Sequence, residues 1–383
     1  MSISAKVICF LLAAQILNIA ALARTSVPDC AAVLPQYLQD LDTGRTPQPL
    51  PIPPSAFPPT IRDVGYNLNK LRPGVFSVHD GTYYSMIVLR RQHLVLLDDP
   101  APGLAFSPTS FNSTLTAAAA LEVLNGTIPK RIDIVFSHQH FDHIGNAPAT
   151  KKALTGRFPR AKIRVIASEG ARDFIAKSNS MRAIIPTHTF RKKAVLRVGG
   201  KRGSDGLSIV LKEIGGHTED DILAYFPPSN GQQGIVFIVD ILLPGFSPAV
   251  GFGITQNLRE YLRVHDIVLK LDFATLIGGH YTRTGTREDV QISKEYALFV
   301  IDASRRALAN GPNFTELAES QGVFDRSDRA FGNFFLTITS TFDTVDSACA
   351  RDVIAEWGCR LASTDVLARS QCMTARFFNI VDM

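Results

Sequence analysis

The sequence lacks any long apolar stretch after its first 23 residues, so no later segment has the roughly 20 apolar residues that a membrane-spanning helix needs. It also lacks low-complexity tracts. Its formal net charge is only +5 over 383 residues, and the basic residues are scattered along the chain. Nucleic-acid binding therefore gains little support. We expect no nucleic-acid partner and no membrane span in the mature chain. We infer no protein partner.

Cysteine is scarce, and none occurs between Cys30 and Cys349. If a leader containing Cys9 is removed, four cysteines remain, and their spacing matches no zinc motif. An even number permits two disulfides in three connectivities, and the sequence leaves the pairing open. We expect disulfides among Cys30, Cys349, Cys359 and Cys372.

The first 23 residues have the pattern of a secretory signal peptide. Lys6 precedes an apolar run over residues 7–20, and Ala21-Leu22-Ala23 fits the small-x-small cleavage pattern. The alternative is an uncleaved membrane anchor, for which the apolar run is short. Three sequons also permit N-glycosylation, at Asn112, Asn125 and Asn313. Together these features predict a secreted, extracellular protein.

Three further segments follow the leader. Residues 24–64 form a proline-rich arm, since seven of the 22 prolines lie between Pro47 and Pro59. That density disfavours helix and sheet and predicts an extended strap. Residues 65–310 carry the main pattern of strands and helices. Residues 311–383 read as a helical C-terminal extension that holds three of the four remaining cysteines.

Strands and helices of the main segment recur in the same order twice. The first set comprises strands at 75–79, 83–89 and 93–97, a helix at 115–124, a strand at 132–136, a helical stretch and a further strand at 163–167. The second comprises strands at 207–214, 222–226 and 235–239, a helix at 258–271, a strand at 274–277 and a helix at 286–310. This repeat predicts an α/β fold of four layers, with two sheets packed face to face and helices on both outer faces.

Four side chains of the types that bind zinc occur within six residues, directly after the predicted strand 132–136. They are His138, His140, Asp142 and His143. Imidazole and carboxylate are ligands that zinc accepts, and the chain has only nine histidines. This density favours a metal site over a metal-free polar loop. Taken alone, the cluster could still be a polar loop or a site for a single metal ion, and the rest of the chain makes both alternatives less favoured.

Three more candidate ligands follow other predicted strands. His217 follows 207–214, Asp240 follows 235–239, and His280 follows 274–277. Each alone would be an ordinary residue at a strand end, but strand ends of two packed sheets can converge on one point. Tyr281 is a candidate hydrogen-bond donor to a substrate oxyanion, with packing at the pocket rim as the equal alternative. The loop 243–252 is a candidate pocket wall or lid.

In their order along the chain these segments resemble the ligand motifs of the metallo-β-lactamase superfamily, namely HxHxDH, GGHT, a strand-terminal Asp and GGH. The resemblance covers about residues 75–310. It implies an αβ/βα sandwich with two Zn²⁺ ions per chain at the sheet edges. By this match His138, His140 and His217 hold the first zinc. Asp142, His143 and His280 hold the second, and Asp240 bridges the two.

The chain has Asp240 at the end of a strand and no cysteine in its central part. In both features it resembles the glyoxalase II, lactonase and arylsulfatase-like branches more than the true β-lactamases. The resemblance implies a hydrolase in which a metal-activated hydroxide attacks a small ester, lactone, thioester or amide. Asp142 is the candidate catalytic residue that orients the hydroxide and carries its proton. The alternatives are a non-hydrolytic metal-binding secreted protein and a single-iron redox member of the same superfamily.

Overall fold

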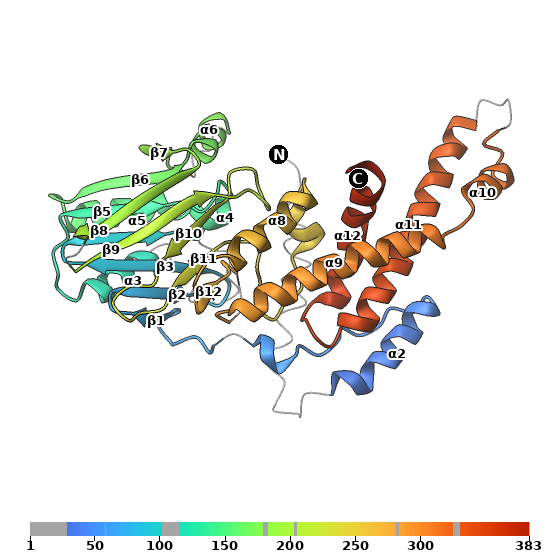
Figure 1. Cartoon of the computed structure of the whole chain (residues 1–383), viewed down its shortest axis with the longest axis horizontal. Coiled ribbons are helices and arrows are strands. Elements are labelled where there is room, and N and C mark those ends of the chain that lie inside the picture. Colours follow the sequence, from blue (N-terminus) through green and yellow to red (C-terminus); the bar gives the residue numbers. More distant parts are fainter. Residues whose placement is uncertain are drawn as a thin grey trace.

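In the computed structural model two β-sheets lie face to face, and a group of helices extends from one end of this sandwich (Figure 1). The structure describes residues 29–57, 59–101, 115–178, 183–202, 205–280, 283–324 and 330–382. The predicted α/β sandwich is confirmed, because both sheets and the helices on their outer faces are present.

The first sheet has seven strands in chain order. Its antiparallel meander consists of β1 (Asn67–Arg72), β2 (Val75–His79), β3 (Tyr84–Arg90) and β4 (His93–Leu97). β5 (Arg131–Val135), β6 (Lys162–Ser168) and β7 (His188–Phe190) then continue the sheet in parallel. Apolar residues of α3 (Leu115–Leu124), α5 (Ala147–Arg157) and α6 (Glu169–Lys177) pack on its outer face.

The second sheet has five strands in the order β12-β11-β10-β9-β8. They are β8 (Lys193–Arg202), β9 (Asp205–Glu213), β10 (Ile222–Phe226), β11 (Ile235–Phe237) and β12 (Thr275–Ile277). The amphipathic helix α8 (Leu258–Leu269) and the long helix α9 (Arg287–Ala309) cover its outer face. Since α9 begins at Arg287, the predicted helix at 286–310 is confirmed to within one residue at each end.

The core between the sheets consists of alternate residues of facing strands. Val88, Val95 and Leu97 of the first sheet pack against Ile209 and Phe237 of the second, and all five are fully or almost fully buried. Removal of such apolar surface from water is the main favourable contribution to folding. It fixes which strand ends of the two sheets meet.

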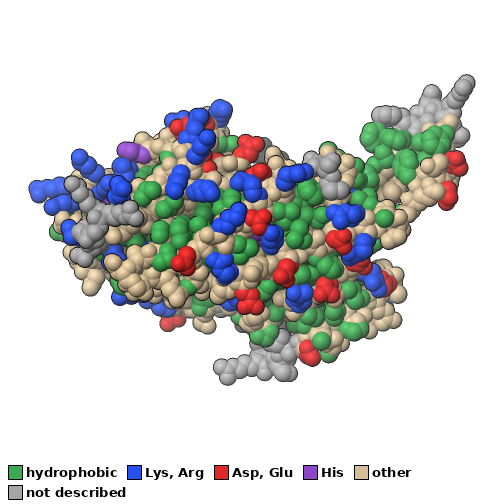
Figure 2. All heavy atoms as spheres, viewed as in Figure 1, with side chains coloured by type: hydrophobic (Ala, Val, Ile, Leu, Met, Phe, Trp, Pro, Cys, Tyr) green, Lys and Arg blue, Asp and Glu red, His purple; other side chains and the backbone are tan. Residues whose placement is uncertain are grey.

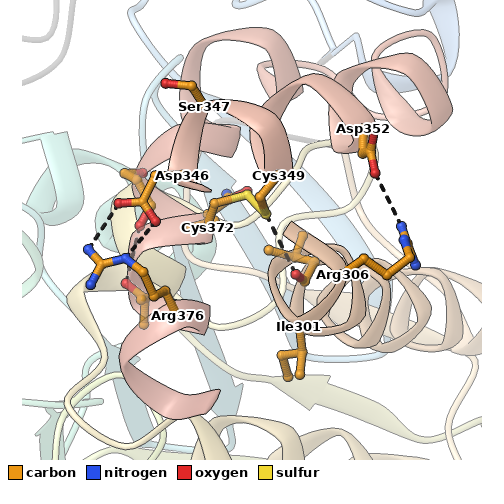
Figure 3. The surroundings of a disulfide bond; sticks show 12 residues. Ile301, Arg306, Asp346, Ser347, Cys349, Asp352, Cys372 and Arg376 are labelled. Atoms are coloured by element: carbon orange, nitrogen blue, oxygen red, sulfur yellow. Dashed lines mark hydrogen bonds and ion pairs between the residues drawn. A yellow bond between two sulfur atoms is a disulfide. The ribbon is translucent and has the colours of Figure 1, made fainter. Parts of the chain in front are cut away.

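The C-terminal extension is helical, as predicted. It consists of α10 (Phe314–Ser320), α11 (Ala330–Trp357), α12 (Thr364–Phe377) and a short π-helical turn, η2 (Phe378–Asp382). α11 and α12 pack on α9 (Figure 1). A disulfide joins Cys349 to Cys372, and beside it Arg376 makes a buried two-bond ion pair with Asp346, at 2.8 and 3.0 Å (Figure 3).

The N-terminal arm lies against this extension. A second disulfide joins Cys30 to Cys359, so the expected disulfides are present among all four cysteines. The expectation of a wholly extended arm is wrong for α2 (Cys30–Asp42), which Asp29 caps by accepting a hydrogen bond from the amide of Ala31. The proline-rich part after it is extended apart from the short 3₁₀ turn η1 (Pro54–Ala56), and the Leu50 amide donates to Asp365.

Among the described residues no helix combines the length and hydropathy that a bilayer crossing requires.

His265 is a buried histidine that couples stability to pH. Its Nδ1 lies 3.0 Å from the Tyr261 carbonyl oxygen and its Nε2 lies 3.0 Å from Ser293 Oγ. Burial lowers its pKa from the usual 6.5 to about 4. Between these values the unfolded chain binds more protons than the folded one. The free energy of unfolding therefore decreases as the pH falls from about 6.5 to about 4, by up to about 3 kcal/mol for this group.

We therefore expect the free energy of unfolding of the His265→Gln variant to fall less between pH 6.5 and pH 4 than that of the wild type. Urea titrations at each pH measure this. The exposed His188 serves as the matched control, and His188→Gln should keep the wild-type pH dependence. Identical pH dependence in His265→Gln and wild type would contradict the assignment.

Candidate metal centre

The structure brings all seven predicted metal ligands together at one end of the sandwich, where strands of both sheets end. The segment after β5 supplies the HxHxDH residues, two of them on the short helix α4 (Phe141–Ile144). The other three candidate ligands follow β9, β11 and β12. In chain order the seven are His138, His140, Asp142, His143, His217, Asp240 and His280.

The candidate ligand atoms form two groups that share Asp240. Within each group the atoms all lie within 4.8 Å of one another. Asp240 Oδ2 lies 3.1 Å from His143 Nε2 and 3.4 Å from His217 Nε2, and Oδ1 lies 2.9 Å from His280 Nε2. One group is His138, His140, His217 and Asp240, and the other is Asp142, His143, Asp240 and His280.

The donor set fits metal ions. His138 is fully buried, yet its Nε2 makes no hydrogen bond with any described residue and faces Asp240 Oδ2 at 3.5 Å. Buried polar atoms nearly always have a partner, so an atom of this kind indicates a ligand. The nearby pair His217 Nε2 and His140 Nδ1, 2.8 Å apart, presents two more nitrogen donors at the same point. Nitrogen and carboxylate oxygen are donors that zinc accepts.

The electrostatics of the cluster also favour a cation. Burial opposes protonation of His143, but the charge of Asp240 and hydrogen bonds to Asp142 and Asp240 raise its pKa well above the ordinary value. Burial likewise acts to raise the pKa of Asp240, and the charges of His143 and His280 hold it well below its usual range. The carboxylates therefore stay ionised in a buried place, and positive charge beside them is stabilised.

Groups behind the ligands orient their rings. His138 Nδ1 lies 2.9 Å from Ser137 Oγ, and His217 Nδ1 donates to the Gly253 carbonyl. The buried Asp98 accepts a hydrogen bond from the Ser137 amide at 2.7 Å. Such contacts fix which ring nitrogen faces a metal. The sequence reasoning missed all three groups, although Asp98 follows the predicted strand 93–97, the same signal that selected Asp240.

The backbone near the site adopts an unusual conformation. Asp240 has a φ of 62°, and Gly251, Phe252 and Gly253 of α7 (Val250–Ile254) have φ values of 54°, 57° and 75°. Such left-handed conformations in non-glycine residues mark positions that the surrounding structure imposes. This left-handed turn carries the Gly253 carbonyl to His217.

The predicted pocket wall at 243–252 takes a different role. The Phe252 side chain is fully buried and packs on Tyr261 in the core beneath α8. Phe246 lines a cavity of about 400 Å³ with Ser55 and Arg360, and none of the seven clustered side chains lines that cavity. The next residue, Gly253, contacts the metal centre through its carbonyl, which accepts a hydrogen bond from His217.

The other predicted site residues are not part of the cluster or are not described. Tyr281 and Asn112 lie outside the described residues. Asn125 and Asn313 are exposed, the latter as the N-cap of α10. The sequence reasoning did not select Tyr83, whose ring centroid lies 4.7 Å from that of His280 and 5.3 Å from that of His143.

No protein-family model matches the chain, and no curated protein matches it in sequence. Solved structures do match. A stereoselective inverting sec-alkylsulfatase from Pseudomonas sp. is 14% identical, with a TM-score of 0.50, and the match covers 82% of this chain and 50% of that protein. A metallo-β-lactamase from Cronobacter sakazakii with a HARLDQ motif is 15% identical, with a TM-score of 0.40 and coverages of 60% and 78%.

A β-lactamase from Chitinophaga pinensis is 12% identical, with a TM-score of 0.41 and coverages of 58% and 82%. At sequence identities this low, the matches are evidence for the fold alone. The match to the sec-alkylsulfatase over 82% of this chain agrees with the observed architecture of two mixed sheets, of seven and five strands, with helices on both outer faces. This chain has the metallo-β-lactamase fold.

Proposed function

We propose that this protein is a secreted, zinc-dependent hydrolase that acts on a small ester, lactone, thioester or amide. The observation that carries the proposal is the convergence of five imidazoles and two carboxylates in two groups that share Asp240. Seven such groups, drawn from four separate segments of the chain and mostly buried, are costly to gather without a ligand, because each buried charge or unpaired polar atom is unfavourable.

We assign the first Zn²⁺ to His138, His140 and His217, and the second to Asp142, His143 and His280, with Asp240 contributing to both. When bound, such ions supply an ionised water as nucleophile near neutral pH. Asp240 suits the shared position because its two oxygens face different histidines, Oδ1 toward His280 and Oδ2 toward His143 and His217.

Asp142 is the candidate catalytic residue, and it would orient the attacking water and hold its proton. Its Oδ2 lies 3.3 Å from His143 Nε2 and 3.6 Å from His280 Nε2, and its side chain is 30% exposed. Burial acts to raise its pKa, but hydrogen bonds with His143 and His280 hold the pKa well below the usual range. The carboxylate is therefore ionised and open to solvent on the side where a substrate would approach.

Secretion belongs to the same proposal. Two disulfides in one chain fit an oxidising compartment, and the exposed sequon asparagines Asn125 and Asn313 are open to glycosylation there. We propose cleavage after Ala23, with residues 65–310 carrying the reaction and residues 311–383 as an extension.

A hydrolysis screen over a panel of substrates tests this function. We expect the zinc-loaded protein to hydrolyse at least one ester, lactone, thioester or amide. Sulfate esters, phosphodiesters and β-lactams complete the panel, the first because the sec-alkylsulfatase shares the fold over 82% of this chain. Turnover should disappear when a chelator removes the metal and return when zinc is added back.

Metal analysis separates the alternatives. We expect about two zinc ions per chain. One iron and no zinc would instead support the single-iron redox member, and two metals without turnover of any panel substrate would support a non-hydrolytic metal-binding protein. Full turnover by metal-free protein would contradict the proposed function outright.

A further inference from the structure

The end of the sandwich opposite the metal cluster is rich in Lys and Arg. The ligands follow the C-terminal ends of their strands, so the opposite end holds the beginnings of β5 and β6 and the turn from β3 to β4. Lys and Arg side chains gather at that end, on the left of the space-filling view (Figure 2). The basic end comprises Arg90, Arg91, Lys130, Arg131, Arg160, Lys162 and Arg164.

Strand pairing places these residues side by side. Arg131 of β5 pairs with Lys162 of β6 in the parallel register. The Lys162 amide donates to the Lys130 carbonyl at 3.0 Å, and the Lys130 amide donates to the carbonyl of Gln92 in the β3–β4 turn at 2.8 Å. Neighbouring strands lie about 4.8 Å apart, so the backbones of these residues form a closely spaced row across the sheet.

One carboxylate balances part of this charge. The buried Asp133 accepts hydrogen bonds from Arg131 Nε at 3.2 Å and from Arg164 Nε at 2.7 Å. Lys130, Arg160 and Lys162 are exposed and make no ion pair with any residue that the structure describes. A helix C-terminus attracts cations, and α5 ends at Arg157, but that effect fades within one turn and does not account for a row that crosses three strands.

The exposed side chains near the basic end indicate which kind of anionic partner fits this surface. Within residues 115–164, all of which the structure describes, no aromatic ring is among the exposed large hydrophobic side chains. Base stacking on single-stranded nucleic acid needs such rings. Membrane insertion needs apolar side chains, and in the same range only Leu121 and Ile128 are both large and exposed.

We propose that the basic end binds a linear anionic polysaccharide through its sulfate or carboxylate groups. Repeated charges on a flexible polymer match a row of cations at regular strand spacing, and long-range attraction speeds the encounter. Because the row lies opposite the metal cluster, a bound polymer would hold the protein in place while the cluster stays accessible. This inference does not depend on the proposed reaction.

Affinity for heparin, used as the sulfated probe, tests the proposal. We expect the purified protein to bind immobilised heparin at about 0.15 M salt, with affinity that falls steeply as salt rises. The triple variant Lys130→Gln, Arg160→Gln and Lys162→Gln should bind at least about tenfold more weakly. Its metal content should stay unchanged, since none of the three residues is near the cluster.

A second triple variant controls for net charge. Arg45→Gln, Arg305→Gln and Arg369→Gln removes the same three charges from exposed positions in the helical part of the molecule, where side-chain exposure is 61%, 53% and 58%. It should bind heparin within about twofold of wild type. Equal weakening in both variants, absence of heparin binding, or tighter binding to single-stranded DNA or anionic phospholipid vesicles would each overturn the proposal.

Discussion

Replacement of Asp240 with Asn is expected to reduce bound zinc to at most one ion per chain and to lower hydrolysis more than about 100-fold. Loss of groups behind a ligand already costs about 10- to 100-fold, and Asp240 is the one carboxylate common to both ligand groups. The amide keeps the size of the side chain but removes the charge that stabilises the neighbouring imidazoles. Metal analysis after dialysis and initial rates on the best panel substrate measure both effects.

Asp302→Asn is the matched control, because Asp302 is half exposed on α9 and, among the residues that the structure describes, forms ion pairs only with Arg305 and Arg306. Both measurements should match wild type there. Circular dichroism would show that Asp240→Asn still folds. Two tightly held zinc ions with undiminished turnover in Asp240→Asn would show that this aspartate is not a ligand.

Gly253→Ala should weaken zinc binding about 10- to 100-fold although Gly253 binds no metal. A Cβ at this position would lie 2.9 Å from His217 Nδ1 and 3.1 Å from the Asp240 carbonyl oxygen. Neither neighbour can move without shifting a ligand, and the Gly253 carbonyl itself accepts the His217 Nδ1–H. Competition with a chromophoric chelator gives the zinc affinity, and thermal unfolding gives the accompanying loss of stability.

Gly231→Ala separates this contact from backbone strain. Gly231 has a φ of 73°, almost the same as the 75° of Gly253, but a Cβ there meets nothing within 4 Å. Both variants should therefore lose similar stability from the left-handed backbone, roughly 1 kcal/mol. Only Gly253→Ala should lose zinc affinity, and an equal loss in Gly231→Ala would mean that the metal centre responds to stability alone.

Much of the fold could be read from the apolar patterns. Strands such as β5 and β10 are short apolar runs between polar loops, and their positions match the prediction to within a residue. The edge strand β1, with the sequence NLNKLR, was not predicted, because its exposed middle leaves no alternation. β8 was missed for a similar reason, since its basic residues and the pair Gly199-Gly200 interrupt the pattern.

In the N-terminal arm the error is the opposite one, because a segment that was expected to be extended forms a helix. The proline content of the arm predicts extended chain, and the structure agrees around Leu50, yet residues 30–42 are helical in spite of Pro35. Apolar side chains of this helix, among them Val33, Leu34 and Leu38, pack against the C-terminal helices, and the disulfide from Cys30 anchors it. Tertiary packing of an amphipathic face commonly outweighs local propensity.

The sequence by itself determined the ligand types and their order, because imidazoles and carboxylates at strand ends are local features that a linear pattern preserves. Only the tertiary structure decided which distant groups support them. The Gly253 carbonyl meets His217 across 36 residues, and Asp98 supports the segment before His138 from another strand. The basic end likewise arises from residues that are scattered in the chain. Contacts of this kind depend on how strands pair and sheets pack, and the order of residues alone does not record such pairings.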